Sequence, residues 1–242
     1  MKHAYLIVMV AVVLGLGLAV LAGPSVMAND RDGPKVIDPD SVVYGRTYSE
    51  WSAEWWQWAF SVPVAIHPLF DHGDCSTGQA GPVWFLGGAT ASGTYVRSCN
   101  VPAETALFFP ILNGEDSSLE ESMGNGCEDP TFDGTIAGLR RCTEWGPGET
   151  LRAEIDGAPV HQLATKYRTR STVFDFTLPD DNWLKATTGK DYLAGAYFPS
   201  AGDGWYLMLS PLHAGNHVIH FYGSCCGGGF TLDVTYNLNV AK

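Results

Sequence analysis

The segment at 230–240, FTLDVTYNLNV, is the clearest strand in this chain of 242 residues. Apolar side chains at its even-numbered positions alternate with Thr, Asp or Asn at the odd-numbered ones. Successive side chains of a strand point to opposite faces, so one face of this segment must be buried and the other wet. The pattern is typical of a sheet that packs on one side only, as in a β-sandwich.

Short strand-like runs separated by turn residues continue toward the N-terminus. We predict strands at 83–86, 94–101, 105–112, 151–155, 173–178, 205–209 and 217–222. Turns are expected at Asn113-Gly114, Asp156-Gly157, Asp203-Gly204 and Ala214-Gly215-Asn216. This spacing predicts a mainly β fold, a β-sandwich of Immunoglobulin-like or jelly-roll type.

One N-terminal helix, rich in tryptophan, is predicted over 47–60. Thr47 followed by Glu50 has the spacing of a capping box, and Pro63 ends the segment. Its apolar stripe consists of Tyr48, Trp51, Trp55 and Trp58. We expect this helix to pack across one end of the sandwich, with no clear helix after it.

The first 28 residues have the features of a secretory signal peptide. Lys2 and His3 precede an almost wholly apolar run at 5–22, and the residues at 26–28 suit cleavage after Ala28. No basic stop-transfer cluster follows, which favours secretion over membrane anchoring. The expected mature protein, 29–242, is a single disulfide-stabilised domain, extracellular or periplasmic, without a stable membrane span.

The net charge of the chain excludes some classes of binding partner. The chain has 14 Lys and Arg against 26 Asp and Glu, a formal net charge of −12, and loss of Lys2 with the leader makes it still more acidic. Nucleic acids and anionic membrane surfaces are therefore poor partners. We interpret pairs such as Glu115-Asp116 and Glu120-Glu121 as solvated charge in a loop excursion at 115–149.

Six cysteines follow the leader: Cys75, Cys99, Cys127, Cys142, Cys225 and Cys226. An even number in an exported chain indicates disulfides, although sequence alone does not choose the pairing. Bonds between Cys75 and Cys99 and between Cys127 and Cys142 would brace two long loops. The adjacent Cys225 and Cys226 would then form a strained ring with each other or bond two different partners.

Several segments resemble those of a known family. They are YSEWSAEWWQWA at 48–59, GPVWFL at 81–86, GWYLMLSPL at 204–212 and HVIHF at 217–221. Together they resemble a family of uncharacterised secreted bacterial proteins, and the resemblance extends over most of the mature chain. It implies export and a bacterial source, and it implies no particular activity.

One candidate catalytic pair lies on the predicted helix. Glu50 and Glu54 are four residues apart beside indoles, as the two carboxylates of a glycosidase would be. Each also has a simpler explanation, because Glu50 suits the helix cap and Glu54 the wet side of the helix.

A candidate metal site combines His67, Asp71 and His72 with His217, a mixed set of nitrogen and oxygen ligands that suits zinc. No HExxH-like spacing supports it. His217 and His220 also point to opposite faces of their predicted strand, so they cannot easily share an ion. We therefore favour structural roles for the histidines and expect no metal or other cofactor.

Tryptophan is the most unusual component of this composition, with eight residues in all. Trp56 is rotated by about 100° from Trp55 and faces away from the stripe. If Trp56, Trp84 or Trp205 is exposed, it offers a flat apolar platform for a sugar ring or another protein.

The sequence favours an exported binding or surface-assembly module without enzymatic activity, with a polysaccharide or another surface protein as its ligand. The alternative is a secreted hydrolase that uses Glu54 or a site of His67, His72 and His217. A flat aromatic surface would favour binding, whereas a pocket that converges on these residues would favour the enzyme. The oligomeric state is left open.

Overall fold

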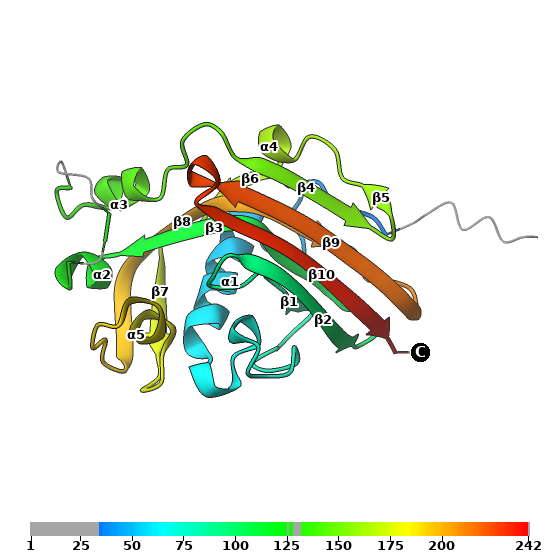
Figure 1. The fold of residues 1–242 in the computed structure, drawn as a ribbon, viewed down its shortest axis with the longest axis horizontal. Coiled ribbons are helices and arrows are strands. Elements are labelled where there is room, and N and C mark those ends of the chain that lie inside the picture. The colour runs from blue at the N-terminus through cyan, green and yellow to red at the C-terminus, as the bar shows by residue number, and fades with distance from the viewer. Residues whose placement is uncertain (1–33, 125, 128–131, 242) are drawn as a thin grey trace, which may run out of the picture. The chain divides into compact units, whose positions relative to one another are not determined.

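Two β-sheets pack face to face in this protein (Figure 1). The structure is a computed structural model and describes residues 34–124, 126–127 and 132–241. The expected signal peptide and its cleavage site lie outside these residues. Within the described ranges, no helix has the length and apolar character needed to cross a membrane.

The first sheet has the strand order β1-β3-β8-β6, and β7 pairs with a second part of β8. Its strands are β1 (Val83–Phe85), β3 (Ala106–Ser117), β6 (Arg168–Arg170), β7 (Phe174–Leu178) and β8 (Gly195–Leu209). β1 and β3 run parallel, and the other pairs run antiparallel. The long strands β3 and β8 form the centre of this sheet.

The second sheet has the order β2-β10-β9-β4-β5. Its strands are β2 (Gly93–Val101), β4 (Thr150–Ile155), β5 (Ala158–Pro159), β9 (Gly215–Cys225) and β10 (Phe230–Val240). β2 runs parallel to β10, and the other pairs are antiparallel. The predicted mainly β sandwich is confirmed, with the difference that both sheets are mixed and not purely antiparallel.

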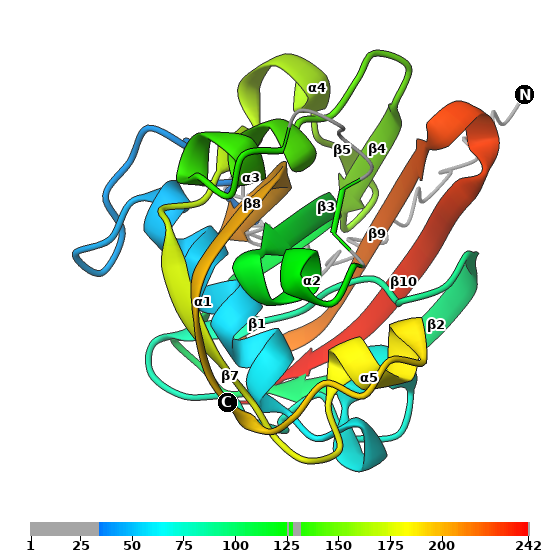
Figure 2. The same cartoon turned by 90° about the vertical axis from the view of Figure 1, so that its left-hand side faces the viewer.

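The two faces of the first sheet contribute to different cores. On one face, Phe109 and Leu207 pack with Phe221 of the second sheet. On the other, Phe108 and Tyr206 pack with helix α1 (Tyr48–Ser61). Figure 2 shows α1 on one side of β3, with β9 and β10 on the other. Because both faces are covered there, residues 106–112 of β3 and 205–209 of β8 are continuously apolar, whereas β10 alternates.

Helix α1 begins with the predicted capping box. The Thr47 hydroxyl accepts a hydrogen bond from the Glu50 N–H, and the Glu50 carboxylate accepts one from the Thr47 N–H. The helix lies against the first sheet and not across one end of the sandwich as predicted. The reason is that its large aromatic side chains, such as Trp55, are buried on several faces of the helix. The first sheet, including β7, provides the apolar surface that buries them.

Two predicted turns are wrong. Asn113-Gly114 and Asp203-Gly204 lie inside β3 and β8, where Asn113 pairs with Gly204 and Gly114 pairs with Asp203. A Cβ atom at Gly204 would lie 2.5 Å from the Leu112 carbonyl oxygen. This glycine therefore permits a close approach of two strands, which is a common role of glycine within sheets.

Short helices also interrupt segments that were predicted to be loops. They are α2 (Ser118–Ser122), α3 (Ile136–Cys142), α4 (Leu163–Lys166) and α5 (Trp183–Thr188), with 3-10 turns η1 (Val64–Ile66), η2 (Pro68–Phe70) and η3 (Cys226–Gly228). Ser117, Thr135 and Asn182 cap three of them with side-chain oxygens. One or two turns of helix give too few residues for a periodic apolar pattern, so the sequence did not distinguish them from loops.

Candidate functional site

The structure gives Glu50 and Glu54 structural roles. The Glu50 carboxylate accepts hydrogen bonds from both the N–H and the hydroxyl of Thr47, at 2.8 Å each, and these bonds lower the pKa of Glu50. Glu54 forms an ion pair with Arg46. A carboxyl group held ionised by a helix cap cannot act as a general acid, so the pair does not support glycosidase chemistry.

The histidines of the candidate metal site are not brought together. His67 is fully buried; its Nε2 donates to the Ala59 carbonyl at 2.8 Å, and its Nδ1 accepts from the Leu69 N–H at 3.1 Å. Burial lowers the pKa of His67 to about 4. Since both ring nitrogens are used inside the core, this neutral histidine has no nitrogen left to bind a metal ion.

The other members of that set also have separate partners. Asp71 pairs with Arg97 at 2.6 Å, and His72 Nδ1 lies 2.9 Å from the Val64 carbonyl oxygen. His217 Nδ1 lies 2.7 Å from the carboxylate of Asp156. Burial alone would lower the pKa of His217, but this hydrogen bond and that to a backbone carbonyl raise it. Each of these three side chains therefore has a hydrogen-bond or ion-pair partner of its own within the chain.

The three tryptophans proposed as a ligand platform are buried. Trp56 is 6% exposed, Trp84 8% and Trp205 3%. The hypothesis of an exposed indole is therefore wrong for these residues, because the helix and both sheets leave two cores to fill. Trp56 does line a cavity of about 240 Å³ with Trp55 and Trp183. That volume is below the roughly 300–1,000 Å³ of usual ligand sites.

Two of the expected disulfides are present, Cys75–Cys99 and Cys127–Cys142. The first joins β2 to the loop after η2, and the second joins α3 to the segment after α2. Cys225 and Cys226 are not bonded, but their sulfur atoms lie only 2.7 Å apart. Because the other four cysteines are paired, each of these two has only its neighbour as a partner within the chain.

We expect the protein exported by its host to begin at Asn29 and to carry three disulfides, the third between Cys225 and Cys226. Intact mass spectrometry before and after reduction measures both features, and the mass difference should be about 6 Da. A retained leader would contradict the first expectation. Alkylation of two thiols without prior reduction would contradict the second.

A group of buried and half-buried carboxyl groups, which was not predicted from the sequence, lies at the end of β3. We define the carboxyl cluster as Glu115, Asp116, Glu120 and Glu121. Asp116 is 5% exposed and Glu120 8%, so their interpretation as solvated loop charge is wrong. β3 extends through Ser117, beyond its predicted end, and α2 follows directly (Figure 1). The spacing of Ser117 and Glu120, a capping-box signal, was the one available hint of this turn.

Hydrogen bonds hold the carboxyl cluster in place. The Ser117 hydroxyl donates to Glu120 at 2.8 Å, the Ser117 N–H donates to Asp116 at 2.9 Å, and the Ser200 hydroxyl of β8 donates to Glu115. Burial, together with the neighbouring carboxylates, raises the pKa of Asp116 to about 8 and that of Glu120 to about 7. The same causes raise the pKa of Glu115 well above its usual value. No Lys or Arg of the described chain forms an ion pair with these three.

A second feature is the outward side of the second sheet, which we call the outer sheet face. It consists of Thr94, Val96, Ser98 and Asn100 of β2, the odd positions 231–239 of β10, the even positions 216–224 of β9, and Thr150, Arg152 and Glu154 of β4. These side chains are half-buried or exposed, while those between them are mostly buried. No described helix or strand packs on this face (Figure 2).

One end of the outer sheet face is a shallow groove lined by amides, which we call the asparagine groove. Strand register places Asn239 between Asn100 and Asn216, with Asn237 in the next row between Ser98 and Val218. Asn239 donates to the side chain of Asn100 at 3.0 Å. These residues surround a groove of about 410 Å³, within the range of usual ligand sites.

Comparison with known proteins adds little. No family model and no curated protein matches the chain. A structure of PbICP-C in complex with falcipain-2 is 9% identical and covers 66% of this chain and 99% of its own, with a TM-score of 0.27. The cysteine protease inhibitor EhICP2 from Entamoeba histolytica is 12% identical and covers 65% and 95%, with a TM-score of 0.22. Both TM-scores are too low to support an assignment of function.

Proposed function

We propose that the protein is an exported, non-enzymatic module that binds a neutral polysaccharide on its outer sheet face. The observation that carries the proposal is that no helix or strand of the described residues covers this face. The first sheet is buried between the second sheet and α1, so the second sheet has the one broad sheet face that remains wet in the described chain. This wet face consists mainly of polar side chains, with Val96 and Val218 as exposed apolar ones, and it is available to a ligand without any rearrangement of the fold.

The chemistry of the asparagine groove suits hydroxyl-rich ligands. Each Asn side chain offers both hydrogen-bond donors and an acceptor, as does each sugar hydroxyl. Asn100, Asn216, Asn237 and Asn239 place four such amides on three neighbouring strands. Ligand hydroxyls could therefore exchange bonds with several amides at once.

Charge favours a neutral ligand over an anionic one. The chain has a formal net charge of −12. On the outer sheet face, Asp233 lies 2.8 Å from His220, and Arg152 lies over the ring of Tyr222. An anionic polysaccharide would be repelled by the overall field without a basic patch to offset it.

The absence of an exposed tryptophan in the described residues limits the expected affinity. Aromatic platforms supply much of the contact area in sugar binding, and Trp56, Trp84 and Trp205 are buried. Binding through hydrogen bonds alone would exchange ligand–water bonds for ligand–protein bonds, with a net gain of about 1 kcal/mol for each. We therefore expect weak binding to single sugars and stronger binding to a polymer that contacts several rows.

The test compares binding of the mature protein to a panel of neutral polysaccharides with that of an Asn237→Ala, Asn239→Ala double variant. Loss of two ligand hydrogen bonds should weaken binding about tenfold or more. Thr165→Ala, an exposed polar change on α4, is the matched control and should leave binding unchanged. Lack of binding to every neutral glycan, or equal binding by the double variant, would contradict the proposal; retention on a surface protein would favour the other ligand class.

A carboxyl-based hydrolase is a second candidate, supported by a different pocket. Glu115 lines a pocket of about 360 Å³ with Glu144, Trp145, Glu149 and the Cys225–Cys226 turn. Glu115 is half-buried, and a carboxyl group with a raised pKa beside other carboxylates is the arrangement of a general acid. Hydrolysis of a bound glycan that is abolished by Glu115→Gln and kept in Thr165→Ala would place this candidate first.

A further inference from the structure

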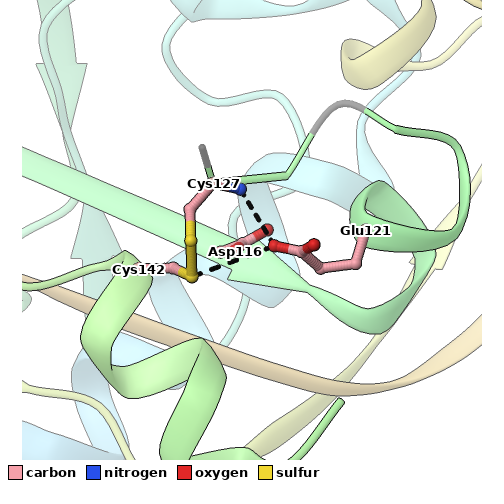
Figure 3. A group of neighbouring side chains, drawn as sticks. All are labelled: Asp116, Glu121, Cys127 and Cys142. Carbon is pink, nitrogen blue, oxygen red and sulfur yellow. Dashed lines mark hydrogen bonds between the residues drawn. A yellow bond between two sulfur atoms is a disulfide. The ribbon is translucent and has the colours of Figure 1, made fainter. Parts of the chain in front are cut away.

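Two members of the carboxyl cluster, Asp116 and Glu121, lie beside a disulfide, away from the outer sheet face. One ligand atom from each of Asp116, Glu121, Cys127 and Cys142 lies within 4.8 Å of all the others (Figure 3). Cys127 and Cys142 form a disulfide, so the two sulfur atoms are not available as thiolate ligands. The two carboxylates remain as the charged ligand atoms of this group.

One oxygen of Asp116 has no hydrogen-bond donor. Its Oδ1 accepts from the Ser117 N–H, but its Oδ2 is buried without a donor and the residue is only 5% exposed. Figure 3 shows the carboxyl groups of Asp116 and Glu121 side by side. Glu121 itself accepts from the Cys127 N–H at 2.9 Å. A buried carboxylate oxygen aimed at a second carboxylate lacks a partner unless a proton or a cation lies between them.

The surrounding side chains do not supply that positive charge. The groups that act on Asp116 are Glu120, Glu121 and the Ser117 backbone, and Glu115 faces Glu120 and Ser200. Lys190, which lies close by, donates to the backbone carbonyls of residues 123 and 124 and not to a carboxylate. Four acidic side chains thus meet without a basic partner among the described residues.

We propose that the carboxyl cluster binds one calcium ion, with Asp116 and Glu121 as its principal ligands. Calcium bonds to carboxylate oxygens at about 2.3–2.6 Å, so a single ion can lie between two oxygens that are less than about 5 Å apart. Oxygen ligands alone do not suit zinc, which prefers nitrogen and sulfur. Magnesium demands near-octahedral geometry and keeps its water, so an irregular pair of one buried and one half-buried carboxylate favours calcium.

The proposal is tested by titrating the oxidised, mature protein with CaCl2 in a calorimeter and by melting it with and without the ion. Calcium sites in extracellular modules have dissociation constants of about 10⁻⁴–10⁻³ M. We therefore expect one ion per chain, and at 10 mM CaCl2 a rise in melting temperature of about 3–10 °C. The same concentration of MgCl2 should give a clearly smaller rise.

Asp116→Asn and Glu121→Gln should each abolish the calcium-dependent rise, because each removes one of the two anionic ligands. Glu144→Gln changes an exposed glutamate that pairs with Arg170 and should keep the full rise. Circular dichroism checks that each variant retains its β structure. If a variant does not fold, the calorimetric titration of the parent protein decides: absence of calcium-dependent heat and of a melting shift would overturn the proposal.

The competing explanation, a shared proton, has a distinct pH signature. A carboxyl group whose pKa is raised by folding contributes stability at low pH, and this contribution is lost as pH rises through the folded-state pKa. In the unfolded chain these carboxyl groups lose their protons near pH 4, so the loss of stability begins near pH 4 and ends near the folded-state pKa, about 7 for Glu120 and about 8 for Asp116. Protons and calcium compete for the same carboxylate oxygens, so the effect of calcium on the melting temperature should be larger at pH 8 than at pH 5. If the melting temperature is the same with calcium and with a chelator across this pH range, a shared proton is the partner of Asp116 and the calcium site is overturned.

Discussion

Replacement of Trp55 by Ala is expected to lower the free energy of unfolding by about 3–5 kcal/mol. Trp55 is 2% exposed, and its Nε1 donates to the Leu86 carbonyl at 2.7 Å. Its ring contacts Trp56 and Trp58 edge-on, with centroids 5.0 and 5.8 Å away. The substitution would leave a cavity at the junction of α1 and the first sheet and an unsatisfied buried carbonyl, which are both costly.

Denaturant unfolding followed by tryptophan fluorescence and circular dichroism measures this change. Glu54→Gln, one helical position away, is the control, because its ion pair with Arg46 is partly exposed and should contribute less than about 1 kcal/mol. A Trp55→Ala protein as stable as the parent would show that the helix is not fixed to the sheet by this residue.

The periodicity of side chains was the part of the fold that sequence predicted well. β10 alternates because one face is wet, and β7 does so too, with Phe174, Phe176 and Leu178 buried. The cap of α1 depends on Thr47 and Glu50, which are local neighbours. Such features depend on residues close in sequence, and a pattern within one segment is enough to predict them.

Pairing between distant strands was not predictable in the same way. Asn113-Gly114 and Asp203-Gly204 have the composition of turns, yet they pair with each other 90 residues apart and continue two long strands. Local composition reports conformational preference, and tertiary contacts can override it. The parallel pairing of β2 with β10 was likewise set by long-range packing and not by either segment alone.

The two candidate sites also differ in whether the sequence predicted them. The outer sheet face follows from alternation, so the wet positions of β10 were predicted and Asn237 and Asn239 were among them. The carboxyl cluster was not predicted, because acidic residues in a segment without a clear strand or helix pattern are normally solvated. Their burial depends on the extension of β3 along β8 and on α2, neither of which has a strong sequence signal.

Asp203→Asn is expected to lower the free energy of unfolding by about 2–4 kcal/mol. Asp203 is 1% exposed and accepts two hydrogen bonds from Arg168, at 3.0 and 3.2 Å, and one from Arg170 at 3.4 Å. Asn has the same shape but lacks the charge, and its amide N–H groups would face guanidinium donors. The expected loss is below the largest values for buried pairs, because Arg168 is one-third exposed and can be hydrated in the variant.

The ion pair also determines how β6 is joined to β8, since Arg168 and Arg170 belong to the first strand and Asp203 to the second. Glu144→Gln provides the control: it removes an exposed partner of Arg170, both side chains being more than half exposed, and should change stability little. Chemical denaturation at pH 7 of both variants measures the difference. If Asp203→Asn and Glu144→Gln are equally stable, the buried carboxylate is not what secures β6, and the hydrogen bonds between the two strands must hold that edge of the sheet alone.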